Sequence, residues 1–263
     1  MQLQPGNRSS VLACPRVRLA DEQADVGTII SLPDPRLLEL AALAGSKWIF
    51  LDCEHGSVAP ADLGRVLAGA PEGVPVLVRL PSNDEIWVKQ ALDAGAAGVI
   101  CPVVEDAATA ERLVRWAKYP PQGARSIGIG RAHGYGLSVG PYLEVANATT
   151  SVVVQIESIT GALALDEILA VEGLGGVFIG PYDLSASMGL VGQPDAPTVQ
   201  DVIADIVRLC RSKGVPVGRF YPTGQAYADA HDRDPLDFVA IGIDLVLLAN
   251  ALRDNLTQQP SDD

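Results

Sequence analysis

The chain has 263 residues, of which 48% are hydrophobic and 19% are charged, and its formal net charge is −13. This length suits one large α/β barrel or two small domains. The acidic balance argues against nucleic acid as a partner, and neither a signal peptide nor an apolar run of roughly 18 residues is present, so we expect a cytoplasmic protein with no membrane partner.

Eight apolar, β-rich runs recur along the chain, each followed by a segment with helical character. The runs cover residues 26–32, 48–52, 74–80, 97–104, 152–157, 175–180, 215–220 and 238–244. Continuous Val/Ile/Leu runs indicate strands that are buried on both faces, as in a parallel sheet. Eight such units predict a single α/β domain of the (β/α)₈ TIM-barrel type over residues 26–257.

An open Rossmann-like sheet is the alternative fold. It would need a G-x-G-x-x-G motif directly after the first strand, and none is found there. The stretch GIGRAHGYG (128–136) is rich in glycine but has His133 at the place of the third glycine. The barrel is therefore favoured.

Three segments interrupt the alternation of strands and helices. Residues 120–150 form a long connection between the fourth and fifth strands, and long loops inside compact domains are often functional. Residues 1–25 are expected to form an irregular N-terminal arm, and residues 258–263 a frayed tail.

The cysteines are scattered, at Cys14, Cys53, Cys101 and Cys210. There is no C-x-x-C motif and no cluster of Cys with His, so neither a structural zinc site nor a disulfide framework is expected. Only Cys53 lies beside candidate chemistry, and a structural thiol is favoured over a catalytic one.

Polar residues gather where the predicted strands end. In a barrel of this type, reactive groups lie at the C-terminal ends of the strands. These ends carry Asp52-Cys53-Glu54-His55-Gly56 after the second strand, Arg79 after the third, Gln155 and Glu157 at the fifth, and Gly180-Pro181-Tyr182-Asp183 after the sixth. The clustering predicts one polar cleft.

The carboxylate of Glu157 needs an explanation, because it ends a run that looks buried. Strand alternation points Val153, Gln155 and Glu157 the same way, so the carboxylate must be paired, bound to a metal or solvated by a cleft. Asp183 follows the adjacent strand, and two such carboxylates can share a hard cation such as Mg²⁺ or Mn²⁺. A buried ion pair between Glu157 and Arg79 is the alternative.

His55 and Arg79 each have two interpretations. His55 is either a general base or a loop histidine bonded to a neighbour. Arg79 either balances nearby carboxylates or stabilises a developing oxyanion, and both can hold at once. The four lysines of the chain lie on predicted helices or before the second strand, so a Schiff-base mechanism is disfavoured and a metal would have to activate a carbonyl.

With these residues in view, the sequence resembles the HpcH/HpaI family of metal-dependent (class II) pyruvate aldolases. It is similar to 4-hydroxy-2-oxoheptanedioate and 2-dehydro-3-deoxyglucarate aldolases over roughly residues 26–255. The resemblance rests on FLDCEHG (50–56), PVLVRLPSND (75–84), KQALDAGAAGVICPVV (89–104), YPPQGARSIG (119–128), VVVQIES (152–158), VEGLGGVFIGPYDLSASMG (171–189) and AIGIDLVLLANAL (240–252).

The resemblance implies a metal and a pyruvate half-site. Glu157 and Asp183 would be the ligands of a divalent cation, Mg²⁺ or Mn²⁺ with Co²⁺ as a third candidate, and no organic cofactor is implied. Gln155 would contact a metal-bound water, and Arg79 would bind the pyruvate carbonyl oxygen. The backbone N–H groups of Tyr182 and Asp183 would receive the pyruvate carboxylate, which agrees with a helical turn that begins near this point.

The resemblance also implies a proton-transfer group and an assembly. His55, oriented by Asp93, would move the proton at the hydroxyl-bearing carbon. The family's barrels form homo-oligomers, commonly hexamers built as trimers of dimers whose subunits exchange the last helix. The long loop with Arg131 and His133 would meet the second substrate near a subunit boundary, and Phe220 would lie at the pocket rim, where packing is its alternative role.

The leading hypothesis is thus a carbon–carbon lyase that joins the enolate of pyruvate to an aldehyde, or reverses that reaction, with a 2-oxo acid and an aldehyde as its small-molecule partners. An oxaloacetate decarboxylase or a citrate-synthase-like condensing enzyme would use the same enolate. A catalytically silent oligomeric binding protein is the hypothesis from another class.

Overall fold

The computed structural model describes residues 24–230 and 235–257. Cys14, the frayed tail expected at 258–263 and all but the last two residues of the expected N-terminal arm lie outside the described residues. No helix within the described ranges is long and apolar enough to cross a membrane.

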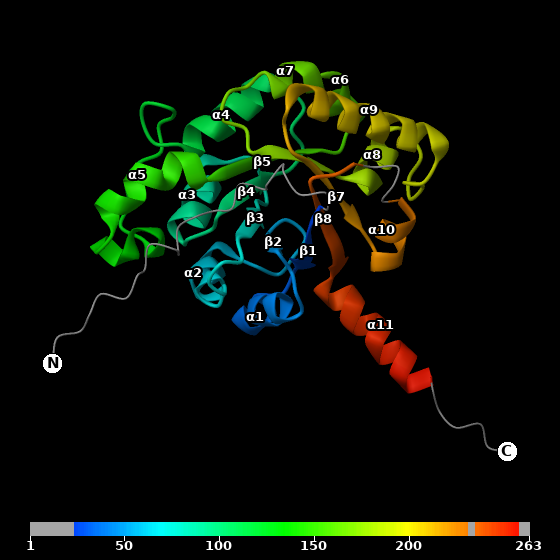
Figure 1. Cartoon of the computed structure of the whole chain (residues 1–263), viewed down its shortest axis with the longest axis horizontal. Coiled ribbons are helices and arrows are strands. Elements are labelled where there is room, and N and C mark those ends of the chain that lie inside the picture. The colour runs from blue at the N-terminus through cyan, green and yellow to red at the C-terminus, as the bar shows by residue number, and fades with distance from the viewer. Residues whose placement is uncertain (1–23, 231–234, 258–263) are drawn as a thin grey trace.

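Eight parallel strands close into a barrel in chain order, which confirms the predicted (β/α)₈ fold (Figure 1). The first and last strands pair from Asp25 opposite Phe238, and this pairing completes the ring. The strands are β1 (Asp25–Ile30), β2 (Trp48–Asp52), β3 (Val76–Arg79), β4 (Gly98–Cys101), β5 (Ser151–Ile156), β6 (Gly176–Ile179), β7 (Val217–Tyr221) and β8 (Phe238–Ile243).

Helices follow the strands and pack around the barrel. Several begin at polar caps whose side chains accept a backbone N–H of the first turn, as Asp34 and Asp106 do. The helices are α1 (Pro35–Leu43), α2 (Pro60–Ala68), α3 (Glu85–Asp93), α4 (Ala107–Ala117), the 3₁₀ helix η2 (Arg131–Gly136), α5 (Val139–Thr149), α6 (Ile159–Leu163), α7 (Leu165–Leu169), α8 (Pro181–Ser187), α9 (Pro197–Lys213), α10 (Gly224–Ala230) and α11 (Asp244–Thr257).

The connection at 120–150 differs from the long loop that the sequence predicts, because it contains η2 and α5. The α5 sequence includes a glycine and a proline, so its local helical signal is weak. Tertiary contacts compensate: Tyr142 and Ala146 are buried against Tyr119 and Ala132. Packing thus gives this segment a structure that its local propensity does not specify.

The barrel interior is a packed core of large aromatic side chains. Trp48, Phe50, Phe178 and Phe238 meet there with ring centroids 5.3 to 6.5 Å apart. Gly27 makes room for this layer, since a Cβ at its position would lie 2.5 Å from the carbonyl oxygen of Trp48 and 2.7 Å from its indole ring. The filled interior confines any cavity to the end of the barrel.

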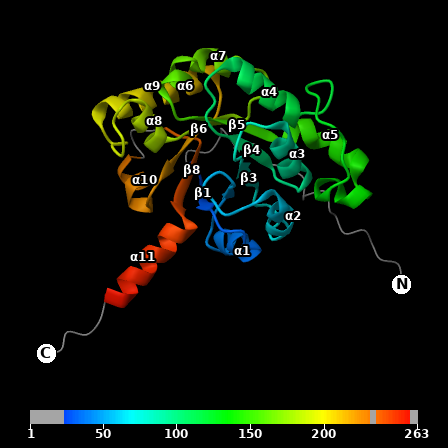
Figure 2. The ribbon, with the colours of Figure 1, turned by 180° about the vertical axis from the view of Figure 1, so that it is seen from behind.

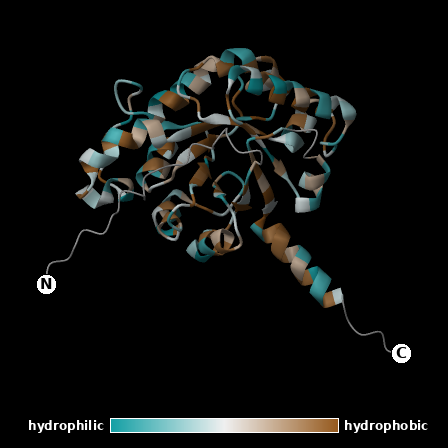
Figure 3. Ribbon diagram, in the orientation of Figure 1, coloured by the Kyte–Doolittle hydropathy of each residue, from teal (hydrophilic) through white to brown (hydrophobic). Residues whose placement is uncertain are grey.

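The C-terminal helix α11 extends away from the barrel (Figures 1 and 2). None of its residues is buried, although several of its side chains are large and apolar (Figure 3). The exposed apolar residues of this helix are Leu245, Val246, Leu247, Leu248, Leu252 and Leu256. A helix that is apolar on much of its surface is normally buried against another element.

Candidate active site

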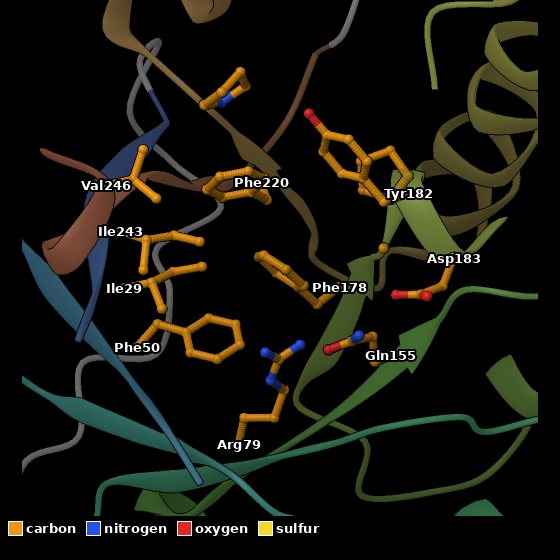
Figure 4. Close-up of a pocket in the computed structure, with 13 residues that line it drawn as sticks. Ile29, Phe50, Arg79, Gln155, Phe178, Tyr182, Asp183, Phe220, Ile243 and Val246 are labelled. Carbon is orange, nitrogen blue, oxygen red and sulfur yellow. The ribbon is translucent and has the colours of Figure 1, made fainter. Parts of the chain in front are cut away.

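A cavity of about 320 Å³ opens at the C-terminal ends of the strands (Figure 4). This volume is near the lower end of the range for small-molecule sites. Its polar side chains come from β3, β5 and the first turn of α8, and its apolar ones from β1, β2, β6, β7, β8 and α11. The cavity lies at the strand ends, where the sequence predicts a cleft; Arg79, Gln155 and Asp183 are among its lining residues, whereas Glu54, His55 and Glu157 are not.

Arg79 is fixed at the edge of the cavity by Asp52. The guanidinium makes a fork with this carboxylate, with Nε 2.9 Å from Oδ1 and Nη2 2.7 Å from Oδ2. It also lies over the ring of Phe50, 5.1 Å from the centroid. Burial alone would raise the pKa of Asp52, but the hydrogen bonds and charge of Arg79 hold it below the ordinary value. The pair is therefore ionised, and the charge-balance role considered for Arg79 is present.

Glu54, one of the acidic residues that the sequence places after the second strand, is a second carboxylate beside Arg79. Its Oε2 lies 3.2 Å from Nη1 of Arg79 and 3.7 Å from Nε2 of His55. Burial raises the pKa of Glu54, and Arg79 and His55 oppose the rise. The His55 side chain is 68% exposed and follows the C-terminal end of β2, at the same end of the barrel as the cavity. Glu54 therefore lies between the buried guanidinium of Arg79 and the exposed imidazole of His55.

Glu157 is buried just beyond the end of β5, and its carboxylate accepts two hydrogen bonds. Its Oε1 accepts a hydrogen bond from the backbone N–H of Val103 at 2.7 Å, and its Oε2 accepts one from the side-chain amide Nε2 of Gln155. Burial raises the pKa of Glu157, and the negative charges of Glu54 and Asp183 raise it further. The buried ion pair with Arg79 that the sequence left open is not formed, because Arg79 pairs with Asp52 and Glu54 instead.

The peptide group between Pro102 and Val103 holds Glu157 in place. Its carbonyl oxygen accepts a hydrogen bond from Nδ2 of Asn83 at 2.7 Å, while its N–H points at Glu157. Val103 has a φ of +48°, in the left-handed region that β-branched residues avoid. Such backbone strain is commonly found at functional sites. No local pattern in the sequence indicates this contact, because its partners come from three different strand ends.

The residues present suit a divalent cation. Gln155 Oε1 is buried without a hydrogen-bond partner, and the negative charge of Asp183 raises the pKa of both Glu54 and Glu157. Within the described ranges no group of three or more His, Cys, Asp or Glu side chains could hold a metal. Hard cations such as Mg²⁺ commonly use only one or two protein carboxylates and complete their shell with water and substrate oxygens.

Asp93 is not brought to His55 within this chain. It ends α3 and so lies beside the N-terminal end of β4, whereas His55 follows the C-terminal end of β2. Its carboxylate instead pairs with the buried Arg125, whose Nη2 lies 2.6 Å from Oδ1. The orientation of His55 by Asp93 stays a prediction, and it would require Asp93 to come from a second subunit.

His133 is also remote from the cavity. Its ring is fully buried, with Nε2 2.9 Å from the hydroxyl of Tyr119, and burial lowers its pKa.

Burial raises the pKa of the Cys53 thiol to about 12, so this thiol stays protonated and is not a nucleophile. Lys118 donates from Nζ to the carbonyls of Asn147 and Thr150, and no lysine lines the cavity, as expected.

Comparison with known proteins places this geometry in context. A family described as HpcH/HpaI aldolase/citrate lyase matches residues 27–251. A hydroxypyruvate/pyruvate aldolase of Pseudomonas aeruginosa is 41% identical, over 90% of this chain and 89% of that protein. A 4-hydroxy-2-oxovalerate aldolase of Rhodococcus jostii is 39% identical, over 88% and 90%. The crystal structure of an HpcH/HpaI aldolase/citrate lyase family protein from Burkholderia cenocepacia superimposes with a TM-score of 0.86 at 31% identity, covering 92% and 96%.

Proposed function

The chain belongs to the HpcH/HpaI aldolase/citrate lyase family and is therefore a carbon–carbon lyase, and we propose that it joins the enolate of pyruvate to an aldehyde or reverses that reaction. The observation that carries the proposal is that Arg79, Gln155 and Asp183 line one cavity at the strand ends, with Glu157 hydrogen-bonded to Gln155. Relatives named as aldolases support catalysis over the silent binding protein.

Glu157 and Asp183 are proposed to hold a divalent cation. When bound there, the ion would supply Lewis-acid polarisation of the keto group of a 2-oxo acid. The negative charge of Asp183, which raises the pKa of Glu157, and the unpaired Gln155 Oε1 support this assignment. Mg²⁺, Mn²⁺ and Co²⁺ remain candidates, and no organic cofactor is proposed.

Arg79 is proposed to stabilise the negative charge that develops on the enolate oxygen. Its fork with Asp52 fixes the guanidinium before substrate arrives, and a preorganised donor costs no reorganisation during the reaction. The carboxylate of the 2-oxo acid is proposed to lie at the backbone N–H groups of Tyr182 and Asp183. These residues are in the first turn of α8, which begins at Pro181 as expected.

His55 is proposed to move the proton at the hydroxyl-bearing carbon. Its exposed side chain after the C-terminal end of β2 and its neighbour Glu54 support a group that exchanges protons with solvent. Asp93 lies at the opposite end of the same barrel, so it could orient His55 only from a neighbouring subunit.

A homo-oligomer is proposed, in the form of a hexamer whose paired subunits exchange α11. The support is the apolar surface of α11, which contacts little of its own barrel (Figures 1 and 3). Exchange of α11 between identical subunits would bury its exposed apolar side chains against another copy of the same chain. The cytoplasmic location stays a prediction.

Deuterium exchange of the pyruvate methyl group in D₂O, followed by ¹H NMR, tests the donor half of this proposal. Exchange should vanish with EDTA and return when Mg²⁺ or Mn²⁺ is restored, because removal of the C3 proton requires polarisation of the keto group. No exchange with Mg²⁺, Mn²⁺ or Co²⁺ would contradict the proposal.

The Glu157→Ala variant tests the metal ligand. It should lose both metal binding, measured by calorimetry with Mn²⁺, and pyruvate exchange. Glu111→Ala, on the exposed face of α4, is the matched control and should behave as the unsubstituted protein. Unchanged Mn²⁺ affinity in Glu157→Ala would remove this residue from the ligand set.

A further inference from the structure

We propose that Asn83 is a positioning residue for Glu157, and that it acts through the peptide group between Pro102 and Val103. By holding this peptide in one orientation, Asn83 sets the affinity of the protein for the divalent cation that Glu157 is proposed to bind. The inference rests on the proposed function and extends the metal site to a residue that is neither a proposed ligand nor part of the cavity lining.

The peptide between Pro102 and Val103 is hydrogen-bonded to a side chain at each of its polar groups. Nδ2 of Asn83 donates to the carbonyl oxygen of Pro102 at 2.7 Å, and the N–H of Val103 donates to Oε1 of Glu157 at 2.7 Å. The peptide group is planar and turns as one unit, so both side chains favour the same orientation. Linked hydrogen bonds also polarise one another, so the bond from Asn83 strengthens the one to Glu157.

This orientation has a conformational cost at Val103. Its φ of +48° lies in the left-handed region that β-branched residues avoid. The Val103 side chain is 53% exposed, so burial of the valine offsets little of the strain. A flip of the peptide would return this φ to negative values, but it would turn the Pro102 carbonyl oxygen toward the Glu157 carboxylate. The repulsion between these oxygens would displace the carboxylate.

The backbone on either side of this peptide is fixed, so the peptide can turn without a wider rearrangement. On one side, Cys101 ends β4 and pairs with Val154 of β5. On the other side, the N–H of Val104 donates to the carbonyl oxygen of Gln155, also on β5, at 3.2 Å. A flip changes only the ψ of the residue before the peptide and the φ of the residue after it. The choice between the two orientations therefore depends on the hydrogen bonds of the peptide itself.

Asn83 has an unfavourable feature of its own. Its Oδ1 is buried and has no hydrogen-bond partner among the described residues, which lowers stability. A leucine of similar size would avoid this cost but could not bond to Pro102. The unpaired Oδ1 and the strained φ of Val103 thus meet at the peptide that donates to Glu157. Local rules that are broken together in this way are typical of functional sites.

The test measures Mn²⁺ affinity by titration calorimetry in Asn83→Ala and Asn83→Leu. The dissociation constant should rise by about tenfold or more in both, the usual effect of removing a group that orients a metal ligand. Leucine keeps the volume of the side chain and adds no charge, so a stable protein is expected even where alanine leaves a cavity. Ser82→Ala, at an exposed side chain of the same loop, is the matched control and should bind Mn²⁺ as the unsubstituted protein does.

Val103→Gly, added to Asn83→Leu, gives a readout that a merely structural role of Asn83 would not move. Glycine adopts a positive φ without steric cost and keeps the N–H that bonds to Glu157. The peptide then no longer needs Asn83 to keep its orientation, so the double variant should recover most of the Mn²⁺ affinity that Asn83→Leu loses. Urea denaturation without metal checks that each variant is folded.

The outcomes separate this inference from the proposed function. Unchanged Mn²⁺ affinity in Asn83→Leu, together with lost affinity in Glu157→Ala, would overturn the inference and leave the metal site standing. A loss in Asn83→Leu that Val103→Gly does not reverse would rule out the route through the peptide. If the unsubstituted protein neither binds Mn²⁺ nor exchanges the pyruvate methyl protons, the proposed function fails and the inference fails with it.

Discussion

Gly180→Ala should damage the site while leaving the barrel folded. A Cβ on Gly180 would lie 2.8 Å from Cβ and 2.9 Å from Oε2 of Glu157, and 3.3 Å from Nε2 of Gln155. Carbon atoms pack best at about 3.5–4.0 Å, so Glu157 must move by about 0.7–1.2 Å. Displacements near 1 Å can cost about 10²-fold in rate. The backbone of Gly180, at φ −99° and ψ 89°, itself accepts alanine, so the clash is the sole perturbation.

The assay for Gly180→Ala combines the pyruvate exchange rate, Mn²⁺ affinity and urea denaturation. We expect exchange to fall by about 10- to 100-fold and the free energy of unfolding by about 1–3 kcal/mol, the usual cost of overpacking. Gly64→Ala is the matched control, because Gly64 lies in the exposed middle of α2 with open space around its Cβ position. It should keep full activity and gain about 0.5–1 kcal/mol of stability. Exchange within twofold of normal in Gly180→Ala would refute the placement of Glu157.

Three further predictions follow from charge and burial. Arg125→Ala removes a fully buried guanidinium bonded to Asp93, so it should lower the free energy of unfolding, measured in urea, by about 3–5 kcal/mol. Arg208→Ala breaks an exposed ion pair and should lower the same free energy by less than about 1 kcal/mol. Similar losses in the two variants would contradict this prediction. Because Arg79 holds the pKa of Asp52 below its unfolded value, the free energy of unfolding should fall as the pH drops below about 4. The urea midpoint of the Asp52→Asn variant should fall less steeply over the same pH range. Leu248→Asp in α11 should shift the mass measured by light scattering toward the 27.5 kDa monomer; an unchanged mass would count against helix exchange.

The barrel could be predicted because its signal is local. Apolar runs rich in Val, Ile, Leu and Phe recur eight times with helical segments between them, and β2 even has the predicted bounds, 48–52. Parallel strands are buried on both faces, so their composition alone distinguishes them from the helices. The segment at 139–149 was missed as a helix because its stability comes from contacts with Tyr119 and Ala132, not from its own residues.

The sequence by itself determined which chemical groups stand at the strand ends, since the position of Arg79, Gln155, Glu157 and Asp183 relative to their strands follows from period-two alternation and strand order. Only the tertiary structure decided how these groups pair. In the tertiary structure Arg79 pairs with Asp52, and Glu157 accepts a hydrogen bond from the N–H of Val103. Asp93 lies at the opposite end of the barrel. These contacts join residues from separate strand ends, and their geometry depends on the closure of the ring, which no local pattern encodes.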